Sequence, residues 1–373
     1  MKQSGPPKIL FLTLYDEKGA SSRHCVYNFL TDFSMANLPY EVRPLLTKNV
    51  YQLIETLAEN TRILTTIATL TKLAFTFLRR YKDVWDSRRF ELVAVQKDVL
   101  PFGAQFLLSI RARNIVFLVD DPIWIKNPSV LGNFPILSSF ITYYRKALVK
   151  SLCKKSSLVL VENPKMQEDL IHFCKNTVVL PSSIPFQSYS VKTESNPQSV
   201  CLGWIGSPGT LYLLKALLPC LEELAKDFSF TFYNVSSTQM ESEKFKIENL
   251  PWTEANELLA LNKMDIGLMP MDTTLFSSYR TSRKWLIYSA AKIMTFAQVT
   301  PLNQELMRDG ENVVFYSSEK EFKEKMANLL RDSKFRDQIA AQAYQDVRTL
   351  YDHPVVATRF VDLIQEQLAP KFN

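Results

Sequence analysis

The chain has 373 residues, of which 46% are apolar and 22% are charged, proportions typical of a soluble globular protein. This length exceeds what one core needs and suits two domains of ordinary size. No run of 18 or more apolar residues occurs, so we expect no membrane-spanning helix. The first residues lack the apolar stretch of a signal peptide, so we expect none to be cleaved.

The net charge of +6 is unevenly distributed. Residues 1–185 contain 24 Lys and Arg against 15 Asp and Glu, whereas the remainder contains 20 against 23. A basic N-terminal half favours an anionic partner, such as lipid phosphate or an anionic membrane surface. Nucleic acid is not expected, because the sequence contains no nucleic-acid-binding motif.

The five cysteines are odd in number and show no Cys-x-x-Cys spacing. They predict reduced thiols in a cytoplasmic protein, with neither a disulfide framework nor a zinc site. The chain has only three histidines, which disfavours a histidine-based metal centre. We therefore expect neither a metal nor a cofactor.

Apolar runs in the first half predict the strands of a doubly wound α/β domain. The first run, residues 8–14, is followed by a polar loop and a helix over about 23–33. Further strands are expected at 40–46, 91–95, 114–119, 157–161 and 177–180, and a basic, aromatic-rich helical segment at 133–153.

The polar stretch 186–199 is predicted to be a linker, after which the strand–helix alternation restarts. We therefore predict two similar Rossmann-like domains facing each other across a cleft. They comprise residues 1–185 and residues 200–350, and a helix over 351–373 returns to the N-terminal domain. Within the second domain we expect strands at 200–205, 228–233 and 264–270, and helices at 210–228, 251–263, 319–331, 333–348 and 354–368.

Residues 63–82 have apolar side chains at helical spacing and several cations near their end. This pattern has two interpretations: a helix packed on the sheet, or an amphipathic basic face that contacts anionic lipid. Asp120 and Asp121 follow the strand 114–119 at its carboxyl end, where ligands bind in such folds. They are either a functional pair or a surface pair.

Glycine usage marks a second stretch, because three of only nine glycines are Gly203, Gly206 and Gly209. Three glycines at one strand-to-helix turn predict a backbone with unusual φ or a close approach to a ligand. The hydroxyls of Ser207 and Thr210 make this a suitable phosphate-binding turn. The dinucleotide-binding spacing and the phosphate-loop lysine are missing, which disfavours a dehydrogenase or a P-loop enzyme.

A third stretch places Arg280, Arg283 and Lys284 in the first turns of a predicted helix. A helix N-terminus already carries partial positive charge, so three cations there repel it unless an anion binds. A basic helix start in solvent is the alternative. The arrangement favours a phosphate site.

These stretches resemble the glycosyltransferases of the GT-B fold, in particular retaining enzymes of glycosyltransferase family 4 that build bacterial surface polysaccharides and lipid-linked glycans. Residues 89–98 and 119–124 are similar to the family's "YDLV…Q" strand and "DDAxW" segment. Residues 203–213 (GWIGSPGTLYL) resemble "GWIGSPxTxxYL". Residues 265–288 resemble "DIGLxPLxxxxFNxxKSxxKxLEY".

The resemblance implies that a nucleotide sugar binds the C-terminal domain and that its diphosphate is held without a metal. Asp120 or Asp121 would lie near the acceptor and take its hydroxyl proton, unless that proton passes to the leaving phosphate. The implied residues are Gly206, Ser207, Thr210, Arg280 and Lys284 for the diphosphate; Leu250, Trp252 and Glu305 for the nucleobase or sugar; Gly19, Ser21 and Arg23 for the lip of the cleft; and Asp120 and Asp121 for catalysis.

The sequence departs from the family at the ribose-binding glutamate, which is replaced by Ile287, and at a Gly-x-Pro, which here begins at Lys292. An apolar residue cannot accept hydrogen bonds from ribose hydroxyls, and a lost charged hydrogen bond costs about 1.5–3 kcal/mol. Two hypotheses follow. The first is a cytoplasmic, peripherally membrane-associated glycosyltransferase acting on a glycan or lipid-linked acceptor. The second is a non-catalytic glycosyltransferase-like subunit that binds a partner or sugar nucleotide.

Overall fold

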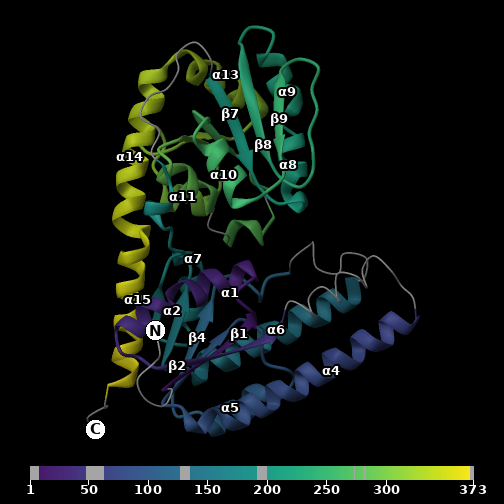
Figure 1. Cartoon of the computed structure of the whole chain (residues 1–373), viewed down its shortest axis with the longest axis vertical. Coiled ribbons are helices and arrows are strands. Elements are labelled where there is room, and N and C mark those ends of the chain that lie inside the picture. Colours follow the sequence, from purple (N-terminus) through teal and green to yellow (C-terminus); the bar gives the residue numbers. More distant parts are fainter. Residues whose placement is uncertain are drawn as a thin grey trace. The chain divides into compact units, whose positions relative to one another are not determined.

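The computed structural model describes residues 8–47, 63–126, 135–190, 200–272, 274–279 and 283–369. The chain divides into two compact units, each built on its own sheet (Figure 1). Unit 1 comprises residues 1–182 together with 356–373, and unit 2 comprises residues 183–355.

Unit 1 contains a six-stranded, fully parallel sheet in the order β2-β1-β3-β4-β5-β6. Its strands are mostly apolar because both faces are covered by helices, as is usual for parallel sheets. They are β1 (Ile9–Tyr15), β2 (Tyr40–Leu46), β3 (Leu92–Gln96), β4 (Ile115–Val119), β5 (Leu158–Val161) and β6 (Thr177–Val179).

One face of this sheet packs against α1 (Ala20–Cys25), η1 (Tyr27–Phe29), α2 (Leu30–Met35) and the last helix, α15 (His353–Leu368). The ring of Phe360 in α15 makes edge contacts with Phe29 and Phe33, at centroid distances of 5.3 and 5.1 Å. The last helix, which the sequence predicted to return to the N-terminal domain, therefore contacts that unit through the ring of Phe360. The short helix α7 (Pro164–Ile171) connects β5 to β6.

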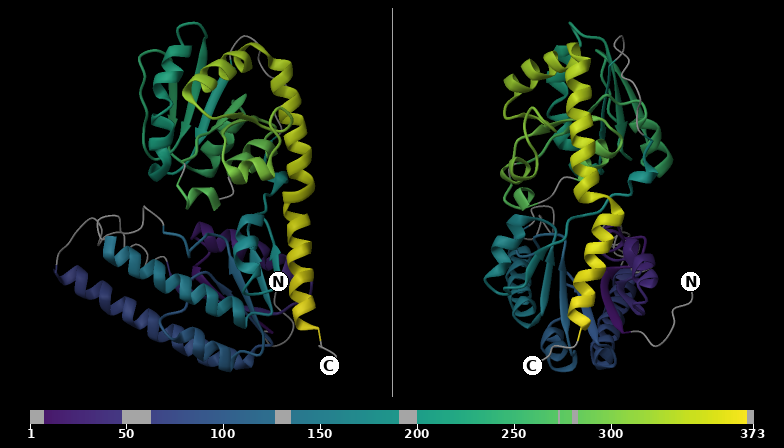
Figure 2. Two further views of the ribbon diagram at one scale, coloured as in Figure 1. Left: turned by 180° about the vertical axis from the view of Figure 1, so that it is seen from behind. Right: turned by 90° about the vertical axis from the view of Figure 1, so that its left-hand side faces the viewer.

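Three helices, α4 (Ile63–Asp86), α5 (Ala104–Arg111) and α6 (Pro135–Lys155), lie side by side beneath this sheet (Figures 1 and 2). A 3-10 turn, η2 (Ser87–Arg89), ends α4. Side chains along a strand alternate between faces, so Leu10 and Val93 point away from the Phe11 side of the sheet and are also fully buried.

Unit 2 contains a second six-stranded parallel sheet, in the order β12-β11-β10-β7-β8-β9. Two such sheets with interleaved helices confirm the predicted α/β class. The strands are β7 (Val200–Ile205), β8 (Phe230–Val235), β9 (Lys246–Leu250), β10 (Ile266–Met269), β11 (Met294–Gln298) and β12 (Val314–Tyr316). The helices are η3 (Phe186–Ser188), η4 (Pro208–Thr210), α8 (Leu211–Lys215), α9 (Leu218–Leu224), α10 (Glu254–Leu261), η5 (Ser277–Tyr279), α11 (Arg283–Ala290), α12 (Pro301–Leu306), α13 (Glu319–Arg331) and α14 (Ser333–Tyr351).

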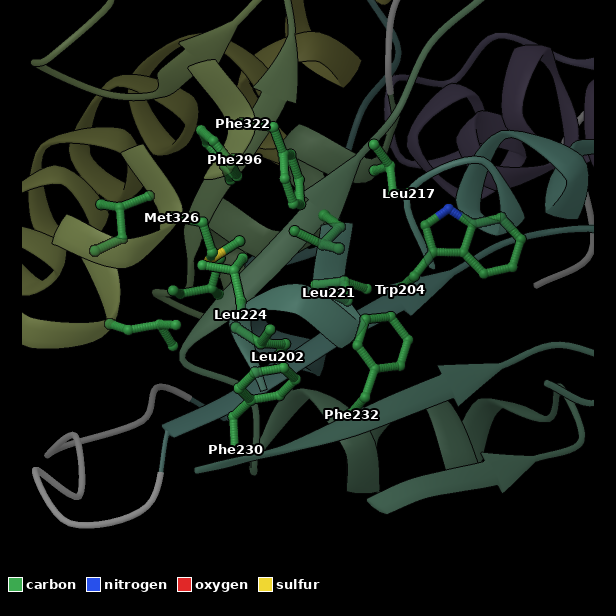
Figure 3. Close-up of a cluster of buried hydrophobic side chains, with 14 of the residues drawn as sticks. Leu202, Trp204, Leu217, Leu221, Leu224, Phe230, Phe232, Phe296, Phe322 and Met326 are labelled. Carbon is green, nitrogen blue, oxygen red and sulfur yellow. The ribbon is translucent and has the colours of Figure 1, made fainter. Parts of the chain in front are cut away.

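The core of unit 2 forms where α9 and α13 cover the central strands (Figure 3). Phe296 on β11 packs against Phe322 on α13, with ring centroids 5.1 Å apart. Trp204, 1% exposed, extends this core to the carboxyl end of β7. The core therefore fixes the carboxyl end of β7, where the glycine-rich turn begins.

Residues 186–190, which the sequence placed in the linker, pack into unit 2. Phe186 is 7% exposed and its ring lies 5.3 Å from that of Tyr344. The main-chain N–H of Phe186 also donates a hydrogen bond to Asp352. In the sequence, the aromatic residue Phe186 at the start of an otherwise polar stretch indicates this packing. Residues 191–199 lie outside the described part of the chain.

Candidate functional site

The carboxyl ends of β7, β8 and β9 line up along one edge of the unit 2 sheet. Ile205 pairs with Val235, and Val235 pairs with Leu250. The main-chain N–H of Gly206 donates to Val235 O at 3.1 Å, and that of Ser236 donates to Leu250 O at 3.0 Å. The register therefore brings the glycine-rich turn and the stretch after Leu250 to the same edge, where ligands bind in open α/β sheets.

The predicted unusual φ of the glycine-rich turn is wrong. Among the described residues, the glycines with positive φ are Gly103 and Gly310. A Cβ at Gly203 or Gly206 would instead stand 2.1 Å from Met264 or 2.2 Å from the Trp204 ring. These two glycines make room for protein side chains: Gly203 for Met264, and Gly206 for the ring of Trp204.

Ser207 and Thr210 lie together at the solvent side of this turn. Their hydroxyl oxygens are 3.4 Å apart, and Thr210 Oγ1 donates to the main-chain oxygen of Ser207 at 3.1 Å. Gly206, Ser207 and Thr210 thus form one small polar surface beside the ring of Trp204.

Lys284, in the first turn of α11, is brought to the same place from a distant part of the sequence. Its Nζ lies 5.5 Å from the centroid of the Trp204 ring, within the range of a cation–π contact. The ring that fills the space beside Gly206 is therefore also the ring on which Lys284 rests. The described part of α11 begins at Arg283, and Arg280 lies outside the described residues.

Tyr288 holds the ends of β7 and β10 in position. Its hydroxyl accepts a hydrogen bond from the main-chain N–H of Ile205 at 3.2 Å and donates to Leu268 O at 3.3 Å. Its ring fits over β10 because Gly267 has no side chain: a Cβ there would stand 2.4 Å from the ring. The side chain is fully buried, and this burial raises the pKa of the phenol.

Replacing Tyr288 with phenylalanine should lower the free energy of unfolding by about 1–3 kcal/mol, because it removes the hydroxyl that bonds two buried main-chain groups. Urea denaturation followed by circular dichroism measures this change. Tyr212→Phe is a suitable control, since that hydroxyl is bonded at the surface to Asp272. Equal stability of Tyr288→Phe and the parent protein would show that the two hydrogen bonds have no net value.

The residues expected near the nucleobase or sugar occupy two different strand ends. Leu250 ends β9 and packs partly against the core, whereas Trp252 is 53% exposed and donates its indole N–H to Glu257 at 2.8 Å. Glu305 is exposed on α12, which follows β11 and packs against η5. Leu250 and Trp252 thus share the edge of the glycine-rich turn, and Glu305 lies beyond β10 and β11 in the strand order.

Ile287 and Lys292, the two positions at which the sequence suggested a departure, lie in α11 and just after it. Ile287 is 9% exposed and belongs to the apolar core around Leu286 and Tyr288. Lys292 follows α11 with φ of 57°, a left-handed conformation that glycine adopts most easily at a helix end. Ile287 is therefore an apolar core residue, and Lys292 is held in a backbone conformation that strains a residue with a Cβ.

In unit 1, the structure joins residues from two separate predictions. Ser21 Oγ donates a hydrogen bond of 2.6 Å to Asp120 Oδ2, which links the expected cleft lip to the expected catalytic pair. Lys97 then bridges the two carboxylates, with Nζ 2.8 Å from Asp120 and 2.6 Å from Asp121. We call Ser21, Lys97, Asp120 and Asp121 the acidic cluster.

Lys97 belongs to the acidic cluster, although the sequence analysis did not single it out. It is 5% exposed and has φ of 49°, although it is neither glycine nor asparagine. Burial alone lowers the pKa of Lys97, but the attraction of Asp120 and Asp121 outweighs burial and raises it. The signal was present: a lysine directly follows the apolar strand 91–95 and Gln96.

Gln96, fully buried at the end of β3, connects the acidic cluster to the first loop. Its Nε2 donates to Ser21 Oγ at 2.9 Å, and its Oε1 accepts from Ser22 Oγ at 2.7 Å. Gly19 precedes α1 as its N-cap, and Arg23 lies in the last turn of that helix. The lip is thus tied to the acidic cluster through Ser21, whereas Arg23 lies two residues further along the helix.

A small cavity of about 40 Å³ lies beside the cluster, between α1 and the carboxyl ends of β4 and β5. Glu162 and Asp120 both line it, and Ser182 donates a hydrogen bond to Glu162 Oε1. Burial, reinforced by the charge of Asp120 and opposed by the Ser182 hydrogen bond, raises the pKa of Glu162 to about 7.

The raised pKa predicts that the free energy of unfolding depends on pH. Glu162 has its ordinary pKa of 4.5 in the unfolded chain but ionises only near 7 in the folded protein. The folded protein should lose on the order of 3 kcal/mol of stability as pH rises through this window. Glu162→Gln should abolish the loss. Unfolding titrations of both proteins between pH 4 and 8 provide the test. Parallel stability curves would contradict the prediction.

Within the described ranges, no group of three or more His, Cys, Asp and Glu side chains is arranged to hold a metal ion. No described helix is long and apolar enough to cross a membrane. None of the five cysteines, all of which lie in the described part of the chain, forms a disulfide.

Residues 218–362 match the family model described as "Glycosyl transferase-like". This match begins after the glycine-rich turn and includes Trp252, Lys284, Ile287 and Glu305. No curated protein sequence matches the chain.

Solved structures show the same fold over nearly the whole chain. A structure of Anabaena Alr3699/HepE in complex with UDP and glucose superposes with a TM-score of 0.62 at 14% identity, covering 96% of this chain and 100% of that one. Sucrose-phosphate synthase from Thermosynechococcus elongatus gives a TM-score of 0.67 at 9% identity, with coverages of 97% and 99%. A glycosyltransferase from Rickettsia africae gives 0.64 at 11% identity, with coverages of 98% and 100%. The chain thus has the two-domain α/β fold of the GT-B glycosyltransferases.

Proposed function

We propose that the protein transfers a sugar from a nucleotide-diphosphate sugar to a glycan or lipid-linked acceptor, with retention and without a metal. The observation that carries the proposal is the convergence of Lys284 and the Gly206 turn on the ring of Trp204. Lys284, with Arg280, would neutralise the diphosphate, and the hydroxyls of Ser207 and Thr210 would bind its oxygens. Leu250 and Trp252 would line the nucleobase, and Glu305 would face the donor sugar.

The acidic cluster would serve the acceptor. Each of its carboxylates already binds the Lys97 ammonium, so the cluster is better suited to orient an acceptor hydroxyl than to take its proton. The leaving phosphate then becomes the proton acceptor, which is the second of the two routes that the sequence left open. In this role Asp120 and Asp121 contact the acceptor, and Ser21 and Lys97 position them.

A first test is ligand-induced stabilisation of the purified chain by UDP, GDP and their sugar conjugates, measured as a thermal shift. UDP comes first because the structurally similar HepE binds it. We expect at least one nucleotide sugar to raise the melting temperature, since a ligand that binds only the folded state stabilises it. No shift with any nucleotide sugar at millimolar concentration would overturn the proposed donor site.

Ile287 favours a second candidate, a non-catalytic glycosyltransferase-like subunit that binds a partner or sugar nucleotide. The buried isoleucine offers no acceptor for ribose hydroxyls. Release of the nucleotide from the bound donor, measured with and without acceptor sugars, distinguishes the candidates. Donor binding without any release would favour the non-catalytic subunit.

We further propose that the protein works in the cytoplasm at the inner face of the membrane, where a lipid-linked acceptor is accessible. The basic N-terminal half supports this location.

A further inference from the structure

Exposed apolar side chains gather on the three helices beneath the unit 1 sheet. Eighteen large apolar side chains are strongly exposed among the described residues, and ten of them lie between residues 75 and 143. This span is less than a fifth of the chain, so the clustering is not the ordinary scatter of single surface residues.

Each helix presents its exposed apolar residues as a stripe at helical spacing. On α4 the stripe is Phe75, Leu78 and Trp85, which are 68%, 64% and 56% exposed. The opposite side of the same helix carries buried residues such as Arg80, 1% exposed, and Val84, 0% exposed. The helix α4 therefore has a second apolar stripe on its solvent side, besides the face that packs on the protein. A helix that served only for packing would carry polar side chains on its solvent side.

The shorter helix α5 and the long helix α6 repeat this arrangement. On α5, Phe106 and Ile110 are one turn apart and are 69% and 65% exposed. On α6, Ile136, Phe140 and Tyr143 are 87%, 67% and 74% exposed.

Contacts join the three stripes into one face. Phe102, just before α5, stacks near Tyr144 of α6 at a centroid distance of 6.0 Å, and its main-chain oxygen accepts a hydrogen bond from Tyr81 of α4. At the other end of α5, Arg111 lies 3.9 Å over the ring of Trp85. We call this surface the α4–α6 face; it consists of Phe75, Leu78, Trp85, Phe102, Phe106, Ile110, Ile136, Phe140 and Tyr143.

The charges on these helices decide what the face would bind. The three helices carry ten Lys and Arg, four on α4, one on α5 and five on α6, and only two acidic residues. Those two, Asp83 and Asp86, both pair with Arg43, and their side chains are only 9% and 18% exposed. Lys72, Arg79, Lys82, Lys146 and Lys150 are exposed.

We infer that the α4–α6 face docks unit 1 onto an anionic lipid bilayer, with the aromatic and aliphatic side chains in the interface and the cations on lipid phosphates. Apolar stripes bordered by cations, with tyrosine and tryptophan among them, have the composition of a surface that lies in the membrane interface. This deepens the proposed membrane association of the enzyme. Vesicle binding needs no sugar transfer, so it can fail or succeed independently of the proposed activity.

The test is co-sedimentation of the full chain with vesicles of phosphatidylcholine alone or mixed with phosphatidylglycerol. We expect binding to the mixed vesicles that is at least about tenfold tighter than to phosphatidylcholine and that weakens with added salt. The double variant Phe106→Gln, Ile110→Gln and the single variant Lys82→Glu should each weaken binding several-fold. Leu350→Gln and Lys334→Glu make matched changes on α14 of unit 2 and should leave vesicle binding unchanged.

The same proteins distinguish the other occupants of this face. Absence of vesicle binding, or equal binding by the α5 double variant and the parent, would overturn the inference. Self-association of the parent in sedimentation velocity, lost in the double variant without any vesicle binding, would assign the face to a second copy of the chain instead. A nucleotide thermal shift retained by the double variant shows that its folding and donor site are intact.

Discussion

Replacing Lys97 with methionine is expected to lower the free energy of unfolding by about 3–5 kcal/mol, the range found when one partner of a buried ion pair is removed. The ammonium lies within 2.8 Å of Asp120 and 2.6 Å of Asp121 and is almost fully buried. Without it, two carboxylates remain close together with no cation between them. Chemical denaturation at neutral pH measures the loss.

Two further variants separate charge from volume. Adding Asp121→Asn to Lys97→Met removes one of the two uncompensated carboxylates and should recover part of the lost stability. Lys175→Met, at an exposed position of the same unit, should change stability by less than about 0.5 kcal/mol. If Lys97→Met were as stable as Lys175→Met, the ion pairs would have no role in holding the cluster.

Replacing Lys284 with alanine is expected to weaken binding of the preferred nucleoside diphosphate by about 1.5–3 kcal/mol, or roughly 10- to 150-fold in Kd. Lys284 is the described cation that rests on Trp204 at the glycine-rich turn. Isothermal titration calorimetry should measure the Kd of the nucleoside diphosphate and of the corresponding nucleoside for both proteins. The loss should appear with the diphosphate and be small with the nucleoside, which has no phosphate.

Lys226→Ala is the matched control, because this exposed lysine of unit 2 lies after α9, away from the strand ends that carry the turn. The sequence also predicts that Arg280→Ala weakens diphosphate binding. Unchanged affinity in both Lys284→Ala and Arg280→Ala would refute the diphosphate assignment while leaving the fold assignment untouched.

Most strands could be predicted because a buried parallel strand is a continuous apolar run. The buried strand at residues 200–205 has the bounds that the sequence predicted. Two strands of the second sheet, Lys246–Leu250 and the three-residue Val314–Tyr316, were missed. Both lie at edges of the sheet, and the first carries polar side chains, which are tolerated there. The helix expected at 210–228 is divided into η4, α8 and α9, because α8 ends at Lys215 and a new helix begins at Leu218, with Pro219 in its first turn.

The candidate site was predictable in part for a physical reason: local patterns show individual residues, whereas the fold determines which of them meet. The sequence singled out Ser21 and Asp120 separately, 99 positions apart, but could not show that they share a hydrogen bond. Lys97 was overlooked because one charge after an apolar run has no motif of its own. The sequence singled out the three glycines, but periodicity could not reveal that the Trp204 ring stands against one of them.

The contact between Phe360 and the pair Phe29 and Phe33 has a consequence for biosynthesis. Synthesis proceeds from the N-terminus, so a ribosome completes all six strands of the first sheet about 180 residues before it makes Phe360. Until then this face of the sheet, covered by α1, η1 and α2, lacks the contribution of α15, while the whole of unit 2 is being made. The first unit to emerge is thus the last to be finished, and a nascent chain stalled before α15 would present Phe29 and Phe33 to chaperones.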